Sequence, residues 1–124
     1  MYNDIRYTGT VGGGRPTATA TSTDLGAMIV SFRDAGTRDI FEGADTRAAR
    51  RTCPRLLWPA AVRKLTILHE ATGPLDLRAP PGNRLERLQG DRLGAYSIRL
   101  NDQYRIVFRW DAGGASQVEI VDYH

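Results

Sequence analysis

Residues 96–110 read YSIRLNDQYRIVFRW, and their alternation is the strongest indication of the fold. Apolar and polar side chains alternate on both sides of Asn101-Asp102, which is the pattern of two half-buried strands joined by a hairpin turn. One face of the second strand carries Tyr104, Ile106, Phe108 and Trp110. The opposite face, called the arginine face below, carries Arg105, Val107 and Arg109. We expect the aromatic side to pack against helices and the arginine face to stay open, with Arg105 near its middle.

The same alternation extends to the neighbouring segments. In the first strand, Ser97 and Arg99 fall on the side opposite to Tyr96, Ile98 and Leu100. Further strands are expected near residues 83–88 and 116–122, and Gly113-Gly114 is expected to form the turn before the last one. Residues 28–32 also open as a strand. This part of the pattern predicts an antiparallel β-meander with one short strand from earlier in the chain.

Helices are expected between the first strand and the meander. Pro59 suits a first helical turn after Trp58, and the apolar positions that follow recur at helical spacing until Gly73-Pro74. Those positions are Ala61, Leu65 and Leu68. A shorter helix is expected over residues 37–44, with Gly36 before it. The order predicts an α+β fold, in which a short N-terminal strand and helices pack on one face of an antiparallel β-meander.

Length and composition limit the class of protein. The 124 residues suffice for one domain, and Cys53 is the only cysteine, so no internal disulfide is possible and a reducing, cytoplasmic location is expected. No stretch approaches the roughly 18 apolar residues of a membrane span, and no signal peptide is visible. Of the 17 Lys and Arg residues only Lys64 is lysine. Arginine suits phosphate, but a GC-rich genome explains the bias equally well, so only individual arginines carry weight.

Residues 1–27 differ from the rest of the chain. They are rich in Gly, Thr and Ala and have neither helical nor strand periodicity, so they cannot bury enough apolar surface to order. Two interpretations stay open. The segment is either a disordered tail or a mis-annotated upstream stretch with Met28 as the true start. The second is favoured because a strand opens directly at Met28, and the domain is expected to span residues 28–124.

The second half of the chain resembles the HigB-type toxins of the RelE/ParE superfamily of bacterial toxin–antitoxin systems. The matching motifs are PGNRLE at 81–86, GDRLG at 90–94, YSI at 96–98, NDQYRI at 101–106 and EIVDYH at 119–124. Upstream, FRD at 32–34, LWP at 57–59 and RKL at 63–65 fit the same family. The resemblance covers residues 28–124 and leaves out residues 1–27.

The resemblance implies a RelE-like fold and an endoribonuclease, or mRNA interferase, that enters the ribosomal A site. There the ribose 2′-OH attacks the adjacent phosphate without a metal or other cofactor, which gives a 2′,3′-cyclic phosphate and a 5′-OH. By position, Arg105 matches the phosphate-binding arginine of the family. The terminal cluster of Asp122, Tyr123 and His124 matches its catalytic residues.

These residue types suit that chemistry. A guanidinium can hold the charge that builds on the phosphate oxygens, and an imidazole exchanges protons near neutral pH. Tyr123 can stack on a base or donate to phosphate, and Asp122 can orient the imidazole. Whether His124 or Tyr123 serves as the general acid or base stays open.

Two positions depart from a pattern that other members of the family show. Glu86 stands where some members have His, and it is an alternative general base. Gln89 stands where some have Lys, and its neutral amide is expected to weaken catalysis. Arg84, Arg87 or Arg92 is expected to compensate for the missing cation. These three arginines and Gln89 are the expected RNA-binding residues.

The expected partners follow from the resemblance. They are a HigA-like helix-turn-helix antitoxin, the ribosome with its mRNA, and operator DNA through the antitoxin alone. Two rival functions are a ParE-like toxin that binds DNA gyrase and a catalytically weak homologue that serves mainly as an antitoxin partner in operator binding. No paired His or clustered carboxylates predict a metal site. Cys53 is not expected to be catalytic, and His69 is expected on the exposed side of its helix.

Overall fold

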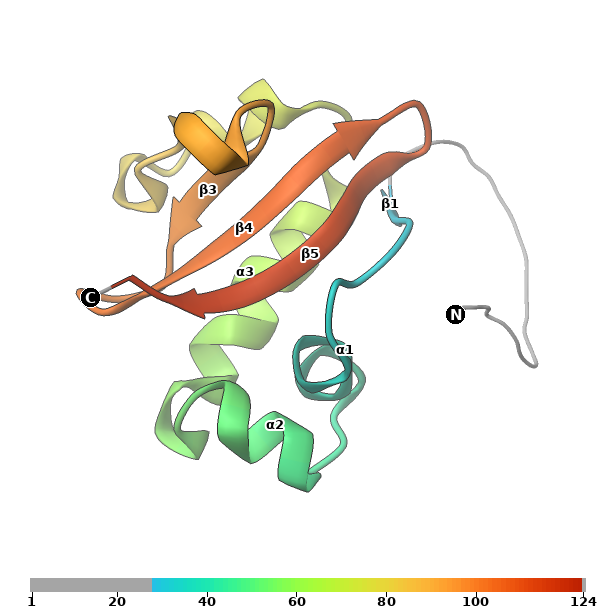
Figure 1. Cartoon of the computed structure of the whole chain (residues 1–124), viewed down its shortest axis with the longest axis vertical. Coiled ribbons are helices and arrows are strands. Elements are labelled where there is room, and N and C mark those ends of the chain that lie inside the picture. Colours follow the sequence, from blue (N-terminus) through green and yellow to red (C-terminus); the bar gives the residue numbers. More distant parts are fainter. Residues whose placement is uncertain (1–27, 124) are drawn as a thin grey trace.

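The computed structural model describes residues 28–123 and is built around a five-stranded sheet in the order β1-β5-β4-β3-β2 (Figure 1). The strands are β1 (Met28–Ile29), β2 (Glu86–Arg87), β3 (Tyr96–Arg99), β4 (Tyr104–Asp111) and β5 (Gly114–Asp122). Strands β2 to β5 are antiparallel neighbours, which confirms the meander, and β1 joins the outer edge of β5 in parallel. Residues 1–27, with both interpretations of them, and His124 lie outside the described residues.

The turns and register follow the alternation in the sequence. Asn101 Oδ1 accepts hydrogen bonds from the backbone N–H groups of Gln103 (2.9 Å) and Tyr104 (2.7 Å), so the hairpin turn at Asn101-Asp102 is confirmed. Arg105 lies opposite Arg99 on one side and opposite Val121 on the other. The strand expected over residues 83–88 is shorter than predicted, because Arg84 takes a left-handed conformation that regular strands exclude.

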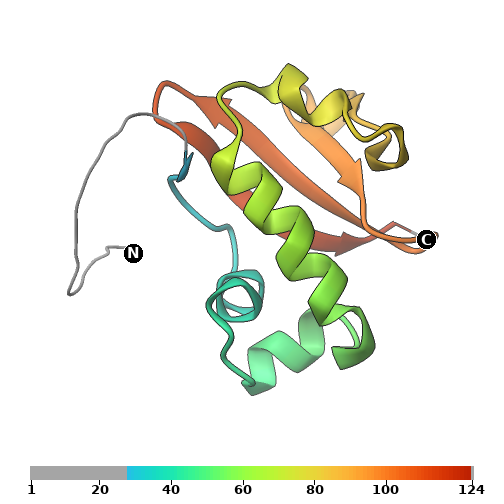
Figure 2. The same cartoon turned by 180° about the vertical axis from the view of Figure 1, so that it is seen from behind.

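Three α-helices pack against the sheet, the longest across one of its faces and the first beside the edge of β5. They are α1 (Ala35–Glu42), α2 (Arg47–Thr52) and α3 (Trp58–Glu70), and Figure 2 shows α3 running across that face. Short 3₁₀ turns follow as η2 (Arg55–Leu57), η3 (Pro74–Arg78), η4 (Pro81–Asn83) and η5 (Gly90–Arg92). Helix α3 confirms the prediction after Trp58, with Pro59 in its first turn. The prediction of a helix over residues 37–44 was wrong at its start, because Gly36 lies inside α1.

The main core lies between these helices and the aromatic side of the sheet. Phe108, Ile106, Leu65 and Leu68 are fully buried there, and Tyr104 and Trp110 pack at its border. The prediction for the aromatic side is therefore confirmed. Burial of each large apolar side chain stabilises the fold by roughly 1.5–3 kcal/mol before conformational entropy is counted.

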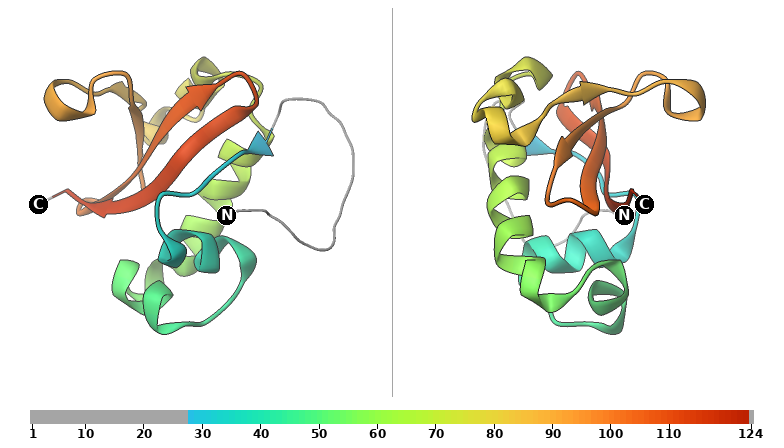
Figure 3. Two further views of the ribbon diagram at one scale, coloured as in Figure 1. Left: turned by 45° about the vertical axis from the view of Figure 1, so that its right-hand side comes forward. Right: turned by 90° about the vertical axis from the view of Figure 1, so that its left-hand side faces the viewer.

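The arginine face is covered, and the expectation that it stays open was wrong. Segment 84–95 passes from the helix side of the sheet to the opposite side, as Figure 3 (right) shows. Leu88 and Ala95 from this segment bury Val107 in a second small cluster, to which Val121 contributes. Arg105, on the same face, keeps only 9% of its surface exposed. Alternation identifies the face a residue occupies but contains no information on which loop covers that face.

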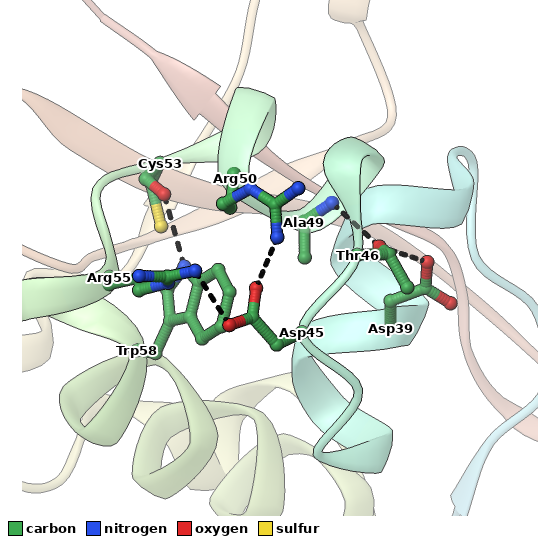
Figure 4. A network of polar contacts seen from close by, with 8 residues as sticks. All are labelled: Asp39, Asp45, Thr46, Ala49, Arg50, Cys53, Arg55 and Trp58. Carbon is green, nitrogen blue, oxygen red and sulfur yellow. Dashed lines mark hydrogen bonds and ion pairs between the residues drawn. The ribbon is translucent and has the colours of Figure 1, made fainter.

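Part of the basic segment 45–55 has a structural role in the corner between α2 and α3 (Figure 4). Asp45 contacts Arg50 at 2.7 Å and Arg55 at 2.8 Å, and the Arg50 hydrogen bond is the main cause that lowers the pKa of Asp45. Trp58 Nε1 donates to the Cys53 carbonyl at 3.0 Å, and the tryptophan ring is partly buried against the core. Burial raises the pKa of the Cys53 thiol to about 11, so the buried thiol stays protonated near neutral pH.

Helices α1 and α2 are in close contact at Gly36. A Cβ atom at this position would lie 1.9 Å from Thr52 Oγ1 and 2.5 Å from the Ala48 carbonyl oxygen. Since that carbonyl is backbone and cannot move alone, Gly36→Ala is expected to lower the free energy of unfolding by about 1–3 kcal/mol. Urea unfolding followed by circular dichroism measures the change. Gly73→Ala, where a Cβ meets nothing within 4 Å, is the control, and equal midpoints for the two variants would contradict the prediction.

His69 is partly buried, and the expectation of an exposed side chain was wrong. Its Nδ1 accepts a hydrogen bond from the backbone N–H of Ile29 at 3.1 Å, and its ring centroid lies 5.4 Å from that of Phe41. The imidazole therefore attaches β1 to helix α3. No local pattern predicts this contact, because the two residues lie 40 positions apart in the chain.

Acid is expected to weaken this attachment. Burial lowers the pKa of His69, and the Glu70 carboxylate offsets only part of the effect. In the unfolded chain the His69 imidazole binds a proton below a pKa of about 6.5, whereas in the folded chain it does so only at lower pH. The contribution of His69 to stability is therefore complete above a pH of about 6.5 and decreases as the pH falls toward the folded-state pKa. Denaturant midpoints at pH 8 and pH 5.5 measure the loss. His69→Asn keeps an acceptor that cannot titrate in this range, so its midpoints should change less; an identical pH dependence would refute the assignment.

Candidate active site

Arg105 is held from two sides in the middle of the covered face. Its Nε donates to Ser97 Oγ at 2.7 Å, and its Nη2 donates to the carbonyl oxygens of Arg84 at 2.6 Å and Ser97 at 3.3 Å. Three hydrogen bonds from one guanidinium fix its plane and leave little rotamer freedom. The charge is therefore fixed in position before any ligand arrives.

The other end of this guanidinium is available to a ligand. Within residues 28–123 no hydrogen bond uses the Nη1 nitrogen of Arg105. In the same range Ser116 Oγ is the one fully buried side-chain nitrogen or oxygen without a partner, so Nη1 keeps contact with solvent. A guanidinium that is fixed on one edge and solvated on the other suits an anion such as phosphate.

A carboxylate and a phenol ring border the guanidinium. Glu86 Oε1 lies 3.9 Å from Arg105 Nη2, and the guanidinium carbon lies 5.7 Å from the centre of the Tyr123 ring. The Glu86 side chain is about half exposed and Tyr123 is 45% exposed, so both reach solvent beside the buried cation. These three side chains form the Arg105 cluster. It combines a fixed positive charge with groups that can accept or donate a proton.

The end of β5 is held by the hairpin that precedes β4. The backbone N–H of Tyr123 donates to the Gln103 carbonyl at 2.7 Å, and Gln103 Nε2 donates to Asp122 Oδ2 at 3.0 Å. These bonds position Tyr123 beside Arg105 and direct Asp122 toward Gln103. His124, which is also a predicted catalytic residue, lies outside the described residues.

The predicted RNA-binding residues are spread over a wider surface. Arg84 contributes its carbonyl to the Arg105 cluster, and its own side chain is exposed. The guanidinium of Arg87 lies 5.7 Å from the centre of the Tyr96 ring, on the other side of β2 from Glu86. Gln89 is exposed at the start of η5 and, together with Arg87, lines a hollow of about 300 Å³.

Arg92 lies farther along the arginine face. Its Nη1 is 3.4 Å from Glu119 Oε2, and the Nε of Arg33 lies 3.7 Å from the same oxygen. Two arginines thus share one carboxylate, and the group keeps a net positive charge. The structure therefore brings Arg105, Glu86 and Tyr123 together and leaves Arg87, Gln89 and Arg92 apart from them.

Ser97 and Gln103 were missed as site residues in the sequence. The alternation placed Ser97 on the same face as Arg105, so a small hydroxyl beside a strand arginine was the available signal. No comparable signal existed for Gln103, because its contacts depend on how β5 ends. Within residues 28–123, no three His, Cys, Asp or Glu side chains gather as metal ligands would. None of the helices in that range is long and apolar enough to cross a bilayer.

Comparisons with known proteins identify the family. The family model that describes the RelE-like toxin of the type II toxin–antitoxin system HigB matches residues 30–124. Toxin HigB-1 of Vibrio cholerae serotype O1 is 43% identical over 88 residues, which cover 71% of this chain and 90% of that protein. An uncharacterized protein of Haemophilus influenzae is 34% identical over 80 residues, which cover 64% of this chain and 76% of its own.

Among solved structures, a YoeB/ParE toxin from Agrobacterium tumefaciens aligns with 78% of this chain and 99% of its own, with a TM-score of 0.45 and 15% identity. The family model and the Vibrio toxin decide the assignment, because they match most of the chain. This chain belongs to the HigB-like toxins, which are RelE-like toxins of type II toxin–antitoxin systems.

Proposed function

We propose that this toxin cleaves mRNA in the ribosomal A site and thereby inhibits translation. The observation that carries the proposal is the Arg105 guanidinium, fixed by Ser97 and Arg84 and solvated at Nη1. Glu86 lies 3.9 Å from Nη2 of the same guanidinium and the Tyr123 ring centre lies 5.7 Å from its carbon, so both are candidates for the proton transfers that cleavage of a bound phosphate needs.

The proposed reaction needs no metal or cofactor. The 2′-oxygen forms a bond to phosphorus, and its proton passes to a general base, while the bond to the 5′-oxygen breaks and that oxygen receives a proton from a general acid. The products are a 2′,3′-cyclic phosphate and a 5′-OH. Arg105 stabilises the negative charge on the non-bridging oxygens. His124 and Tyr123 are the candidates for acid and base, with Asp122 to orient the imidazole, and Glu86 is the alternative base.

The remaining basic residues are proposed to hold RNA. The backbone of Arg84 contacts Arg105 and its side chain is exposed, so we propose it as one replacement for the lysine that some members have at the position of Gln89. Arg87 and Arg92 present further positive charge to the RNA backbone, together with Gln89. A type II toxin implies an antitoxin, and we propose a HigA-like helix-turn-helix protein that also connects the toxin to operator DNA in the cytoplasm.

Gln89 favours two rival functions. A neutral amide at this position lacks the charge that would help hold the phosphate, so a ParE-like gyrase-binding toxin is one alternative. The other is a catalytically weak toxin that acts mainly as an antitoxin partner in operator binding. A gyrase poison would break DNA and induce the SOS response, whereas an mRNA interferase would stop translation first.

The test is cleavage of a short mRNA by the purified toxin, freed from its antitoxin, with and without programmed ribosomes. We expect cleavage in the A-site codon only when ribosomes are present, with a 2′,3′-cyclic phosphate on the upstream fragment. Absence of cleavage in both conditions would overturn the proposal. Gyrase-dependent DNA breaks in the same preparation would then support the ParE-like alternative.

A further inference from the structure

A chain of hydrogen bonds connects helix α3 to the loop that holds Arg105. Near the middle of α3, the Nζ of Lys64 donates to Asn83 Oδ1. Asn83 is completely buried, and its Nδ2 donates to the carbonyl oxygens of Leu77 and Ala79, each at 3.2 Å. A buried amide with all these contacts fixes the path of the chain from η3 to η4.

The next residue along the chain completes the connection. Arg84 has φ 46° and ψ 57°, a left-handed conformation that is unfavourable for a residue with a Cβ atom. Its N–H donates to the Pro81 carbonyl at 3.1 Å, and its own carbonyl accepts from Arg105 Nη2 at 2.6 Å. Because the left-handed turn is unfavourable alone, its position depends on the neighbours that hold it, and Asn83 is the adjacent one.

We propose that Lys64 is a positioning residue for the active site, because its bond to Asn83 holds the turn whose carbonyl orients the Arg105 guanidinium. Lys64 contacts no group that would touch the RNA in the proposed reaction. It acts through Asn83 and Arg84, and the inference rests on the proposed function of the Arg105 cluster. Burial, with the charges of Arg63 and Arg99, lowers the pKa of Lys64, which fits an ammonium that is partly withdrawn from water at Asn83.

Lys64→Met tests the proposal because it keeps the aliphatic stem and removes the donor. We expect the maximal rate of single-turnover mRNA cleavage to fall about 10- to 100-fold, since a small displacement of a catalytic group has an effect of that size. The half-saturating toxin concentration should not change. Lys64→Arg restores a charged donor and is expected to recover most of the rate.

The matched control is Arg63→Met, one residue earlier on the same helix. Arg63 is exposed and makes no hydrogen bond or ion pair within residues 28–123, so this variant removes a neighbouring charge without touching Asn83. A general effect of positive charge on RNA binding would raise the half-saturating concentration in both variants. A positioning effect would lower the maximal rate in Lys64→Met alone.

A second experiment tests the position of Arg105 without measuring RNA cleavage. The Nε–H of Arg105, which donates to buried Ser97 Oγ, should exchange slowly with solvent in an NMR experiment, and the loss of its signal in Arg105→Lys assigns it. We expect at least 10-fold faster exchange in Lys64→Met and parent-like exchange in Arg63→Met. Parent-like exchange in Lys64→Met would overturn the inference, whatever the cleavage rates. If the parent toxin cleaves no RNA, the proposed function fails, and this exchange comparison alone decides whether Lys64 orients Arg105.

Discussion

Arg105→Ala is expected to lower the rate of ribosome-dependent mRNA cleavage by about 100- to 1000-fold, the usual effect of losing one fixed donor to a developing oxyanion. The guanidinium is oriented before the substrate binds, so it stabilises the transition state without reorganising. Single-turnover cleavage of a short mRNA on programmed ribosomes measures the effect. Induction of the variant in cells without antitoxin should also leave growth intact.

Arg109→Ala is the matched control for this prediction. Arg109 lies on the same strand and face as Arg105, but its Nη1 donates to the Leu93 carbonyl at 3.0 Å, away from the cluster. The Arg105 variant also leaves Ser97 Oγ and the Arg84 carbonyl without their donor, which costs about 1–3 kcal/mol of stability for each buried group. Tm values therefore accompany the rates. Cleavage by Arg105→Ala as fast as by a folded Arg109→Ala would exclude the assigned role.

The sequence predicted the sheet well because period-two alternation is a local property. The strand around Arg105, the hairpin at Asn101-Asp102 and the aromatic face toward α3 all depend on neighbouring residues. The attachment of β1 to β5, in contrast, pairs Met28 with Gly114 across most of the chain. Nothing near Met28 specifies that partner, so the residue pattern predicted a strand without its place in the sheet.

The sequence identified residues of the candidate site but not their arrangement in space. Arg105, Glu86 and Tyr123 were all selected from the sequence, yet burial of Arg105 was not, because segment 84–95 covers it only in the folded chain. The contact between Lys64 and Asn83 spans 19 residues and involves two unrelated elements. Contacts of this kind, between residues that support the site from behind, depend on tertiary packing, and local patterns cannot predict them.

Gly114→Ala is expected to be the most destabilising single substitution considered. Gly114 has φ +130°, a conformation that side chains with a Cβ rarely adopt, and it pairs with Met28 at the start of β5. An added Cβ would lie 2.0 Å from the Met28 carbonyl oxygen, which is backbone and cannot rotate away. Strain of about 1–3 kcal/mol adds to overpacking of about 1–3 kcal/mol. The sum is a large part of the roughly 5–15 kcal/mol that stabilise a typical domain.

The position of the clash at Gly114 predicts which contacts are lost first. The clash pushes β1 away from β5, so the hydrogen bond from Val30 N–H to the Ala115 carbonyl and the His69 contact with Ile29 should be lost before the β3–β4 hairpin opens. Hydrogen exchange should therefore be fast at Val30 and Ile29 in Gly114→Ala, while the urea midpoint falls. Gly82→Ala, whose Cβ meets nothing within 4 Å and whose φ is negative, controls for the added methyl group. Equal urea midpoints for the two alanine variants would mean that β1 contributes little to the stability of the sheet.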